Sequence, residues 1–242
     1  MSLGEHLEEL RTKLIQGLLL VGALTLVFLS FGKEVHSFLI SPYRHVLGPD
    51  AKFIQIQLMA PFVIYLKSSF LISVLFALPI LLYLLWTFVA PAVSSKTELW
   101  GKAVILFSTL LFWSGLAICW FLVFEDFLRI FLVVLQPEGV NPQLPIEEYY
   151  DIFFNLHLVF GSAFQLPIVM ILLGRLGIIS SDMLFNRWRE SVLIIALASA
   201  ILSPGPDVFS MCMLLVPLVF LFLLSAFFMK FMELGERDEQ SF

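Results

Sequence analysis

Long apolar stretches without charged residues dominate the chain, and short polar segments separate them. Six such stretches can be read from the sequence: 14–32, 68–95, 103–124, 152–174, 191–206 and 208–229. A helix needs roughly 20 apolar residues to cross a hydrocarbon core about 30 Å thick. Four stretches meet this length comfortably, and the last two meet it only as a pair. The pattern therefore predicts an all-α integral membrane protein.

We expect one membrane domain over residues 1–242, with six transmembrane helices. Their expected bounds are 14–32, 62–88, 103–124, 152–174, 190–203 and 208–229. Pro204 and Pro206 cut the fifth apolar stretch to a helix of only about 18 Å. The short turn that follows favours a compact hairpin of the fifth and sixth spans. The alternative is one re-entrant loop followed by one full span, which would move the C-terminus to the other face.

The distribution of Lys and Arg predicts the orientation, because cations are enriched in cytoplasmic loops. With six spans, one face receives Arg11, Lys13, Lys96, Lys102, Arg175, Arg187, Arg189, Lys230 and Arg237, whereas the other receives Lys33, Arg44, Lys52 and Arg129. Both termini are therefore expected in the cytoplasm. The polar segments 33–60 and 125–151 are then external, and their prolines predict caps over the bundle instead of long helices.

Composition supports the membrane class. Hydrophobic residues make up 60% of the chain and charged residues 14%, and the mean hydropathy is +0.98. A water-soluble core of this size could not bury so much apolar surface. The first stretch follows Arg11 and Lys13, as a secretory signal would, but its end lacks a small-x-small cleavage site, which favours a retained span.

The usual searches find no catalytic or cofactor machinery. The chain has no phosphate-binding loop and no His-Glu-x-x-His motif, and its four histidines are scattered. Ser203 and Ser210 near Asp207 resemble part of a hydrolase site, but no histidine or lysine base accompanies them, so a polar turn is the better interpretation. We expect no enzyme, no metal and no cofactor.

Polar residues at membrane depth matter for a competing hypothesis, a small-solute transporter. Lys67 lies close enough to the external interface for its long side chain to snorkel. Gln165 needs hydrogen-bond partners but carries no charge, and His157 alone is too little for a proton relay. A transporter of this kind also predicts internal repeats and broken helices, and no clear repeat is found. The segment 161–163 predicts close helix packing.

Short motifs in a fixed order carry a family resemblance. They are His6-Leu7-Glu8-Glu9-Leu10-Arg11, Ser41-Pro42, residues 79–92, residues 160–167 and Pro206-Asp207-Val208-Phe209-Ser210. Together they resemble the TatC family, the multi-spanning core of the twin-arginine protein translocase. The resemblance implies a cup-shaped bundle of six helices in the cell inner membrane, with both termini cytoplasmic and with short fifth and sixth spans.

The resemblance also implies a function. Members of the family bind folded precursors through a signal peptide with two adjacent arginines, and the proton motive force drives their transport. The implied partners are these signal peptides, single-span proteins of the TatA type and the TatB type, further copies of the chain and the lipid bilayer, but not nucleic acid. A non-transporting membrane scaffold is the second alternative, and it would not recognise arginine pairs.

Candidate site residues follow from the resemblance. Glu9 matches the signal-binding glutamate of the family, Leu10 and Arg11 follow it, and Phe88 matches an aromatic position beside the same site. Glu98 is the candidate second carboxylate, although the loop before it is one residue longer than usual. Carboxylates suit this task because they accept paired hydrogen bonds from guanidinium groups. Without the resemblance, the same residues read as a solvated first helical turn, interfacial packing and an ordinary loop charge.

The remaining candidates are structural or intramembrane. Gln165 stands where the family commonly has glutamate, and it is expected to contact a partner helix or water. Pro42, Lys67 and Asp207 are expected to support the structure on the external side.

Overall fold

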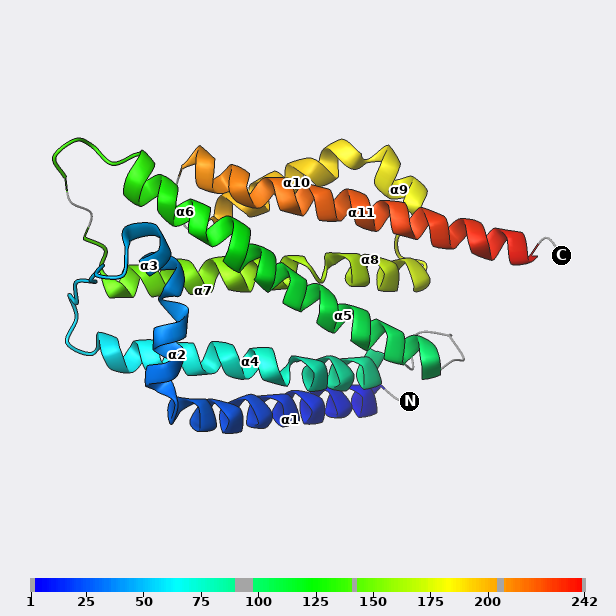
Figure 1. Ribbon diagram of the computed structural model, residues 1–242. Helices are drawn as coiled ribbons and strands as arrows, with labels where there is room; N and C mark the ends of the chain where they lie inside the picture. Colours follow the sequence, from blue (N-terminus) through cyan, green and yellow to red (C-terminus); the bar gives the residue numbers. More distant parts are fainter. Residues whose placement is uncertain (1–2, 90–97, 141–142, 204–206, 241–242) are drawn as a thin grey trace. The chain divides into compact units, whose positions relative to one another are not determined.

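The computed structural model is helical in nearly all of the chain that it describes, which confirms the all-α class. It describes residues 3–89, 98–140, 143–203 and 207–240, with side chains for 7–88, 101–140, 143–203 and 207–231. The elements in chain order (Figure 1) are α1 Leu3–Leu29, α2 Gly32–Leu39, α3 Ser41–Leu47, α4 Ala60–Val89, α5 Glu98–Ile118, the π-helix η2 Cys119–Phe124, α6 Glu125–Arg129, the π-helix η3 Ile130–Val134, α7 Ile146–Ala163, α8 Leu166–Arg175, α9 Ser181–Asn186, α10 Trp188–Leu202 and α11 Val208–Gln240.

Within these residues, five helical segments are long and apolar enough to cross a membrane. They are Leu7–Leu29, Ala60–Phe88, Gly101–Val134, Ile146–Arg175 and Val208–Phe231. The helix in the fifth apolar stretch, α10, has 15 residues and spans about 22 Å, so it is short, as predicted. The resemblance also implied a short sixth span, but the apolar part of α11 has 24 residues and is of ordinary length.

The third helix is longer than its apolar stretch. Glu125 ends the uncharged sequence, but the helix continues through α6 and η3 to Val134. One turn of α6 brings Arg129 within 3.4 Å of the Glu125 carboxylate, and such i,i+4 pairs support a helix. The expected span 103–124 therefore lies within a longer helix, because a charge ends an apolar stretch without ending a helix.

The fourth helix is broken. α7 ends at Ala163 and α8 begins at Leu166, with Pro167 in the first turn of α8. Proline has no N–H to continue the preceding helix and is tolerated in a first turn. The Gln165 N–H instead bonds to the Ser162 carbonyl at 3.0 Å. The fourth apolar stretch thus forms two helices with a tight turn at Gln165.

The chain divides into two compact units. The first comprises Met1–Thr109 and Trp120–Phe154, and the second comprises Leu110–Cys119 and Asn155–Phe242. In the first unit α1 lies along α4, and α2 also packs on α4 (Figure 1). In the second unit α8, α9 and α10 pack against α11. The single domain expected from the sequence stays a prediction.

Close helix packing in the second unit rests on two glycines. A Cβ at Gly115 would lie 2.7 Å from the Phe164 ring, and a Cβ at Gly161 would lie 2.7 Å from the Phe112 ring. Each phenylalanine therefore occupies the space that a side chain on the opposite helix would need. The close packing predicted at 161–163 is confirmed at Gly161.

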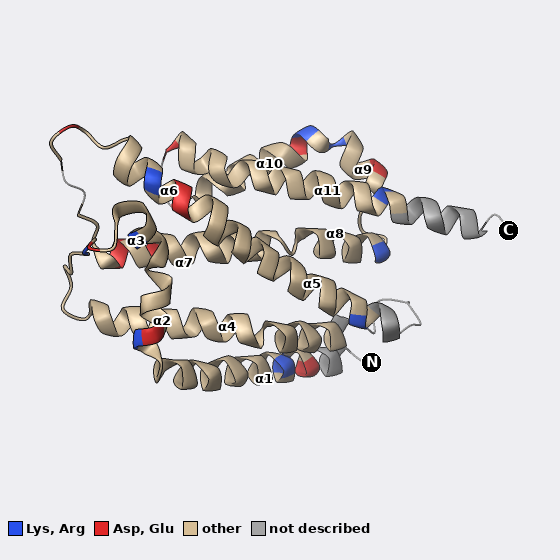
Figure 2. Ribbon diagram, viewed as in Figure 1, with Lys and Arg blue, Asp and Glu red and all other residues tan. Residues whose placement is uncertain are grey.

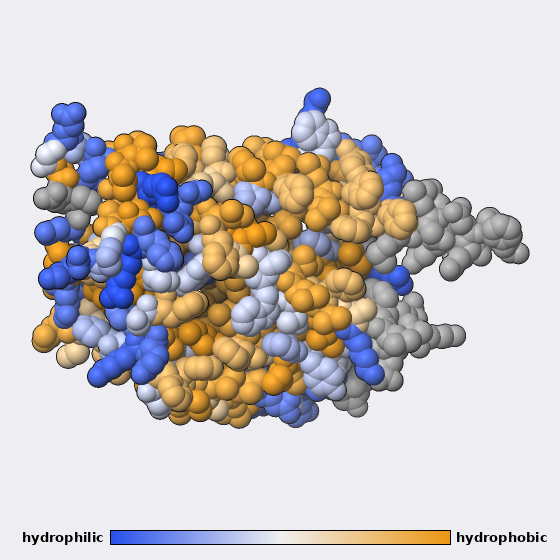
Figure 3. All heavy atoms as spheres, in the orientation of Figure 1, coloured by the Kyte–Doolittle hydropathy of each residue, from blue (hydrophilic) through white to orange (hydrophobic). Residues whose placement is uncertain are grey.

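The outer surfaces of the helices are apolar. Figure 3 shows hydrophobic side chains over most of the visible helices, and Leu18 is 74% exposed while Phe220 is 64% exposed. Exposed apolar surface costs about 25 cal/mol per Å² in water, so these faces suit a lipid environment. Figure 2 shows that the coloured, charged residues of α1 lie near its N-terminal end, and residues 14–29 of α1 carry no charge.

Candidate functional site

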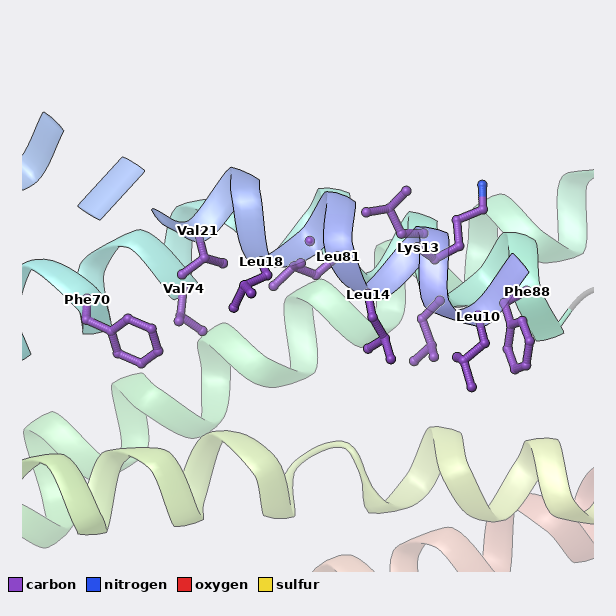
Figure 4. Close-up of a pocket in the computed structure, with 12 residues that line it drawn as sticks. Leu10, Lys13, Leu14, Leu18, Val21, Phe70, Val74, Leu81 and Phe88 are labelled. Carbon is purple, nitrogen blue, oxygen red and sulfur yellow. The ribbon is translucent and has the colours of Figure 1, made fainter. Parts of the chain in front are cut away.

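An apolar groove runs between α1 and α4 in the first unit (Figure 4). Its volume is about 410 Å³, and it is lined by Leu10, Lys13, Leu14, Gly17, Leu18, Val21, Phe70, Val74, Leu81, Leu84, Leu85 and Phe88. Gly17 lets the two helices approach, because a Cβ there would lie 2.9 Å from the Leu81 side chain. Eleven apolar or glycine positions and one cation therefore form a surface suited to an apolar segment.

Two predicted site residues meet at one end of this groove. Leu10 from α1 and Phe88 from α4 lie next to one another at that end, while Val21 and Phe70 lie at the other (Figure 4). Residues 78 positions apart in the sequence are thus brought together by the packing of α1 on α4. The Lys13 side chain also reaches the groove, but its nitrogen points away from Leu10.

Glu9 precedes Leu10 in α1 and has an unsatisfied acceptor. Its Oε2 is buried and has no hydrogen-bond partner among the described residues. Lys13 is one turn further along α1, a spacing at which an ion pair commonly forms, yet no Glu9–Lys13 ion pair is present in this part of the structure. A buried acceptor without a donor costs about 1–3 kcal/mol, and more when it is charged. The carboxylate is therefore placed to gain from an added donor.

The other charged positions of the head differ from Glu9. The side chains of Glu8 and Arg11 are exposed, and the Glu8 carbonyl accepts a hydrogen bond from the Thr12 hydroxyl at 2.9 Å. Glu98 begins α5, but its side chain lies outside the residues whose side chains are described. The sequence prediction of a second carboxylate at Glu98 is accordingly not tested by geometry.

Lys67 lies near the start of α4, away from Phe88, and it forms an ion pair. Its Nζ donates to the Asp151 carboxylate from α7. The sequence predicted only a snorkelling Lys67 and did not predict its pairing with Asp151. A signal was available, since Asp151 directly precedes the fourth apolar stretch on the face assigned to Lys67.

Pro42 lies in a buried aromatic cluster of the first unit. It occupies the first turn of α3 and is buried, and the next residue, Tyr43, is only 1% exposed. The Tyr43 ring stacks on Phe53 with ring centroids 4.0 Å apart and meets Tyr149 edge-on at 5.7 Å. The Tyr149 hydroxyl donates to the Leu39 carbonyl at 2.7 Å. The structural position predicted for Pro42 therefore lies within a packed core of α3 and α7.

Further polar contacts tie the same region together. The Ile54 N–H bonds to the Leu144 carbonyl at 3.2 Å, and the Ile146 N–H bonds to the Ile54 carbonyl at 2.9 Å. One oxygen of Glu147 accepts the N–H groups of Ile56 and Gln57, at 3.2 and 2.8 Å. The loop before α4 is thus tied to the start of α7. These hydrogen bonds were not predicted from the sequence because they depend on the pairing of two loops.

His36 from α2 hydrogen-bonds to the hydroxyl of Tyr150 from α7, with 2.6 Å between Nδ1 and Oη. Its ring also meets Tyr65 of α4 edge-on. Burial lowers the pKa of His36 below its ordinary value, and the Arg44 guanidinium lowers it further. The neutral imidazole is therefore favoured in the folded chain.

In the second unit, Asp207 and Gln165 occupy helix ends. The two oxygens of Asp207 accept hydrogen bonds from the Ser210 N–H at 2.8 Å and the Ser210 hydroxyl at 2.6 Å, which caps α11. Burial raises the pKa of Asp207, but these hydrogen bonds outweigh burial and lower it overall. Gln165 is half-buried at the break between α7 and α8. The polar-turn interpretation of Asp207 and Ser210 agrees with this cap.

The comparisons with known proteins agree with one another. The family model described as Sec-independent protein translocase protein (TatC) matches residues 5–217. A curated TatC protein from Halothiobacillus neapolitanus is 34% identical over 93% of this chain, and the match covers 61% of that longer protein. One from Escherichia coli strain K12 is 31% identical over 93% of this chain and 87% of its own length.

A solved structure is similar along nearly its whole length. It is a crystal structure described as the twin arginine translocase receptor TatC, with 28% identity and a TM-score of 0.81. The alignment covers 93% of this chain and 98% of that one.

Proposed function

The chain belongs to the TatC family of Sec-independent protein translocase proteins, and we propose that it binds the twin-arginine signal peptide of folded precursors. The family transports proteins and is not a family of enzymes. The chain is a multi-pass membrane protein with a role in protein translocation through the twin-arginine system. This assignment also replaces the small-solute transporter, although the broken fourth helix is a feature of such transporters.

Glu9 carries the proposal. A guanidinium group presents paired N–H donors that match a carboxylate, and one oxygen of Glu9 is buried without a donor among the described residues. An arriving arginine would supply that donor. The second arginine of the signal is assigned to Glu98, in agreement with the sequence prediction.

The groove extends this proposal to the rest of the signal peptide. It begins beside Glu9 at Leu10 and Phe88 and continues along α1 and α4 with an apolar lining. A signal peptide carries an apolar segment after its charged start. We assign the groove to that segment, with Leu10 and Phe88 nearest the arginine pair and Arg11 outside the apolar surface.

The finer architecture belongs to the same proposal. We assign six spans in a cup-shaped bundle, with both termini cytoplasmic in the cell inner membrane, because cations are concentrated on one face. In this arrangement the subunit nucleates a complex with TatA-type and TatB-type proteins and further copies of itself, driven by the proton motive force. Gln165, at the break in the fourth helix, is assigned to a polar contact with a partner helix, and Pro42, Lys67 and Asp207 to structural support.

The test is site-specific photocrosslinking from Thr12, which is exposed one turn beyond Glu9 on the same face of α1. Full-length chain in membrane vesicles is offered a precursor whose signal carries Arg-Arg or Lys-Lys. We expect capture of the Arg-Arg precursor and a large loss with Lys-Lys. Glu9→Gln should abolish the preference, whereas Glu8→Gln, the matched control one residue away, should preserve it.

Two outcomes contradict the proposal. Equal capture of the two precursors would show that arginine pairs are not recognised and would favour a scaffold. An equal effect of Glu8→Gln and Glu9→Gln would show that general negative charge, not the position of Glu9, attracts the precursor.

A further inference from the structure

A cluster of cations and aromatic rings lies at one end of the second unit. It comprises Arg187, Trp188 and Arg189 at the start of α10, Phe185 in α9 and Lys230 in α11. The Arg189 guanidinium lies 5.6 Å from the centre of the Trp188 ring, and the Lys230 ammonium lies 5.3 Å from the centre of the Phe185 ring. Both distances are within the range of cation–π attraction. We call these five residues the α9–α10 cluster.

The apolar contact between α9 and the rest of the unit is made by Leu184. Leu184 packs with Ile179 and Ile195 against the buried residues Met170, Phe222 and Met229. The side chains of Met183, Phe185 and Trp188 are 45%, 39% and 49% exposed. A short helix that partly buries one apolar side chain and exposes others beside cations has the character of an interfacial helix.

Among the side chains that the structure describes at this end, cations outnumber carboxylates. Its described cations are Arg175, Arg187, Arg189 and Lys230, and its described carboxylates are Asp182 and Glu190. Glu190 lies 3.9 Å from Arg187, which leaves Arg189 and Lys230 on their aromatic rings. Figure 2 shows an acidic residue on α9 and charged residues of both signs at the start of α10. Because the neighbouring helices α8, α10 and α11 are apolar, these cations lie where a membrane helix leaves the hydrocarbon.

We propose that the α9–α10 cluster binds the headgroup of an anionic glycerophospholipid, with Arg189 and Lys230 contacting the phosphate and Phe185 and Trp188 contacting the glycerol and upper acyl region. Basic sites between transmembrane helices bind such headgroups, and Trp is enriched at membrane interfaces because its ring is amphipathic. The aromatic rings hold the two cations in place before the lipid arrives. This site shares no residue with the groove beside Glu9, and it needs no precursor.

The test is native mass spectrometry of the full chain in detergent, titrated with phosphatidylglycerol and, separately, with phosphatidylethanolamine. One cation contributes about fivefold to anionic-lipid affinity, so Arg189→Gln with Lys230→Gln should weaken phosphatidylglycerol binding by about 25-fold. Phosphatidylethanolamine has the same phosphate but no net charge, so its binding should be weaker in the parent and should fall less in the variant. Arg189→Lys with Lys230→Arg keeps both charges and should retain most of the affinity.

The matched control is Lys33→Gln with Lys52→Gln, which removes two exposed cations of the first unit and should leave lipid binding unchanged. Equal phosphatidylglycerol affinity in the parent and the Arg189/Lys230 variant would overturn the proposal, and so would equal losses in the control. Displacement of the lipid by millimolar inorganic phosphate would assign the cluster to free phosphate instead. Retained lipid affinity with lost binding of a protein partner would assign it to protein.

Discussion

The carboxylates near the two ends of α4 differ in whether they have a partner. Near its start, Lys67 is paired with Asp151. Near its end, Phe88 lines the groove beside Leu10, and Glu9 keeps a buried oxygen without a partner among the described residues. A paired carboxylate contributes to the stability of the fold, whereas an unpaired one costs stability until a ligand arrives. The difference separates the end that supports the structure from the end proposed to bind.

The largest expected effect comes from Glu9→Gln. Losing a charge-assisted bidentate partner costs about 2–5 kcal/mol, so affinity for a twin-arginine signal peptide should fall at least about 30-fold. The thermal midpoint of the free protein should not decrease, because the substitution removes the charge from a carboxylate whose Oε2 is buried without a donor among the described residues. Fluorescence anisotropy with a labelled signal peptide measures the first effect, and a detergent-based unfolding assay the second. A fall in thermal midpoint with unchanged peptide affinity would show that Glu9 supports the structure and does not bind the peptide.

The second largest effect, a loss of stability, is expected from Tyr149→Phe in the buried aromatic cluster of the first unit. The variant leaves the buried Leu39 carbonyl without its donor, which should cost about 1–2 kcal/mol of unfolding free energy. Peptide affinity should remain within about twofold. Denaturant unfolding of the purified protein, beside Tyr83→Phe at an exposed tyrosine, provides the measurement and its control. An equal loss in both variants would show that the Leu39 contact is not the cause.

A smaller effect is expected from Lys67→Met. The side chains of Lys67 and Asp151 are 46% and 62% exposed, and exposed pairs contribute only up to about 1 kcal/mol. The charge-swapped double variant, Lys67→Asp with Asp151→Lys, should recover part of the loss in the unfolding assay. If Lys67→Met weakens peptide binding instead of stability, the Lys67 end of α4 cannot be purely structural.

The smallest expected effect is a loss of stability at low pH that depends on His36. The pKa of His36 is lowered in the folded chain, so at pH values above about 6.5 the residue is neutral in both states and does not change stability. Below that value the unfolded chain takes up the proton first, and stability should fall as pH drops towards the folded-state pKa. Thermal unfolding between pH 7.5 and 5 should show a smaller loss in His36→Gln than in the parent. Identical pH profiles would exclude His36 as the cause.

The sequence predicted the helical class well because apolar length is a direct requirement of the bilayer. It predicted the short α10 from two prolines, and it predicted close packing at Gly161 from small residues. It did not predict the continuation of the third helix past Glu125, since a helix can carry charge once it leaves the hydrocarbon. The turn at Gln165 was also missed, although Pro167 is a local signal for it.

The candidate site was predictable only in part. Leu10 and Phe88 were named through a family resemblance, but their meeting in one groove depends on the packing of α1 on α4. The Glu9 oxygen that has no partner in the described part of the chain and the pairing of Lys67 with Asp151 both depend on three-dimensional geometry, which residue spacing does not contain. A prediction from spacing would have paired Glu9 with Lys13.

The reciprocal packing of two glycines and two phenylalanines has a consequence for the evolution of this family. Phe112 fills the space over Gly161, and Phe164 fills the space over Gly115. An alanine at either glycine position is therefore tolerated only with a smaller partner across the helix pair. Positions 112 and 161 should therefore covary in related sequences, and so should positions 115 and 164. A change at one position of a pair should be accompanied by a compensating change at the other.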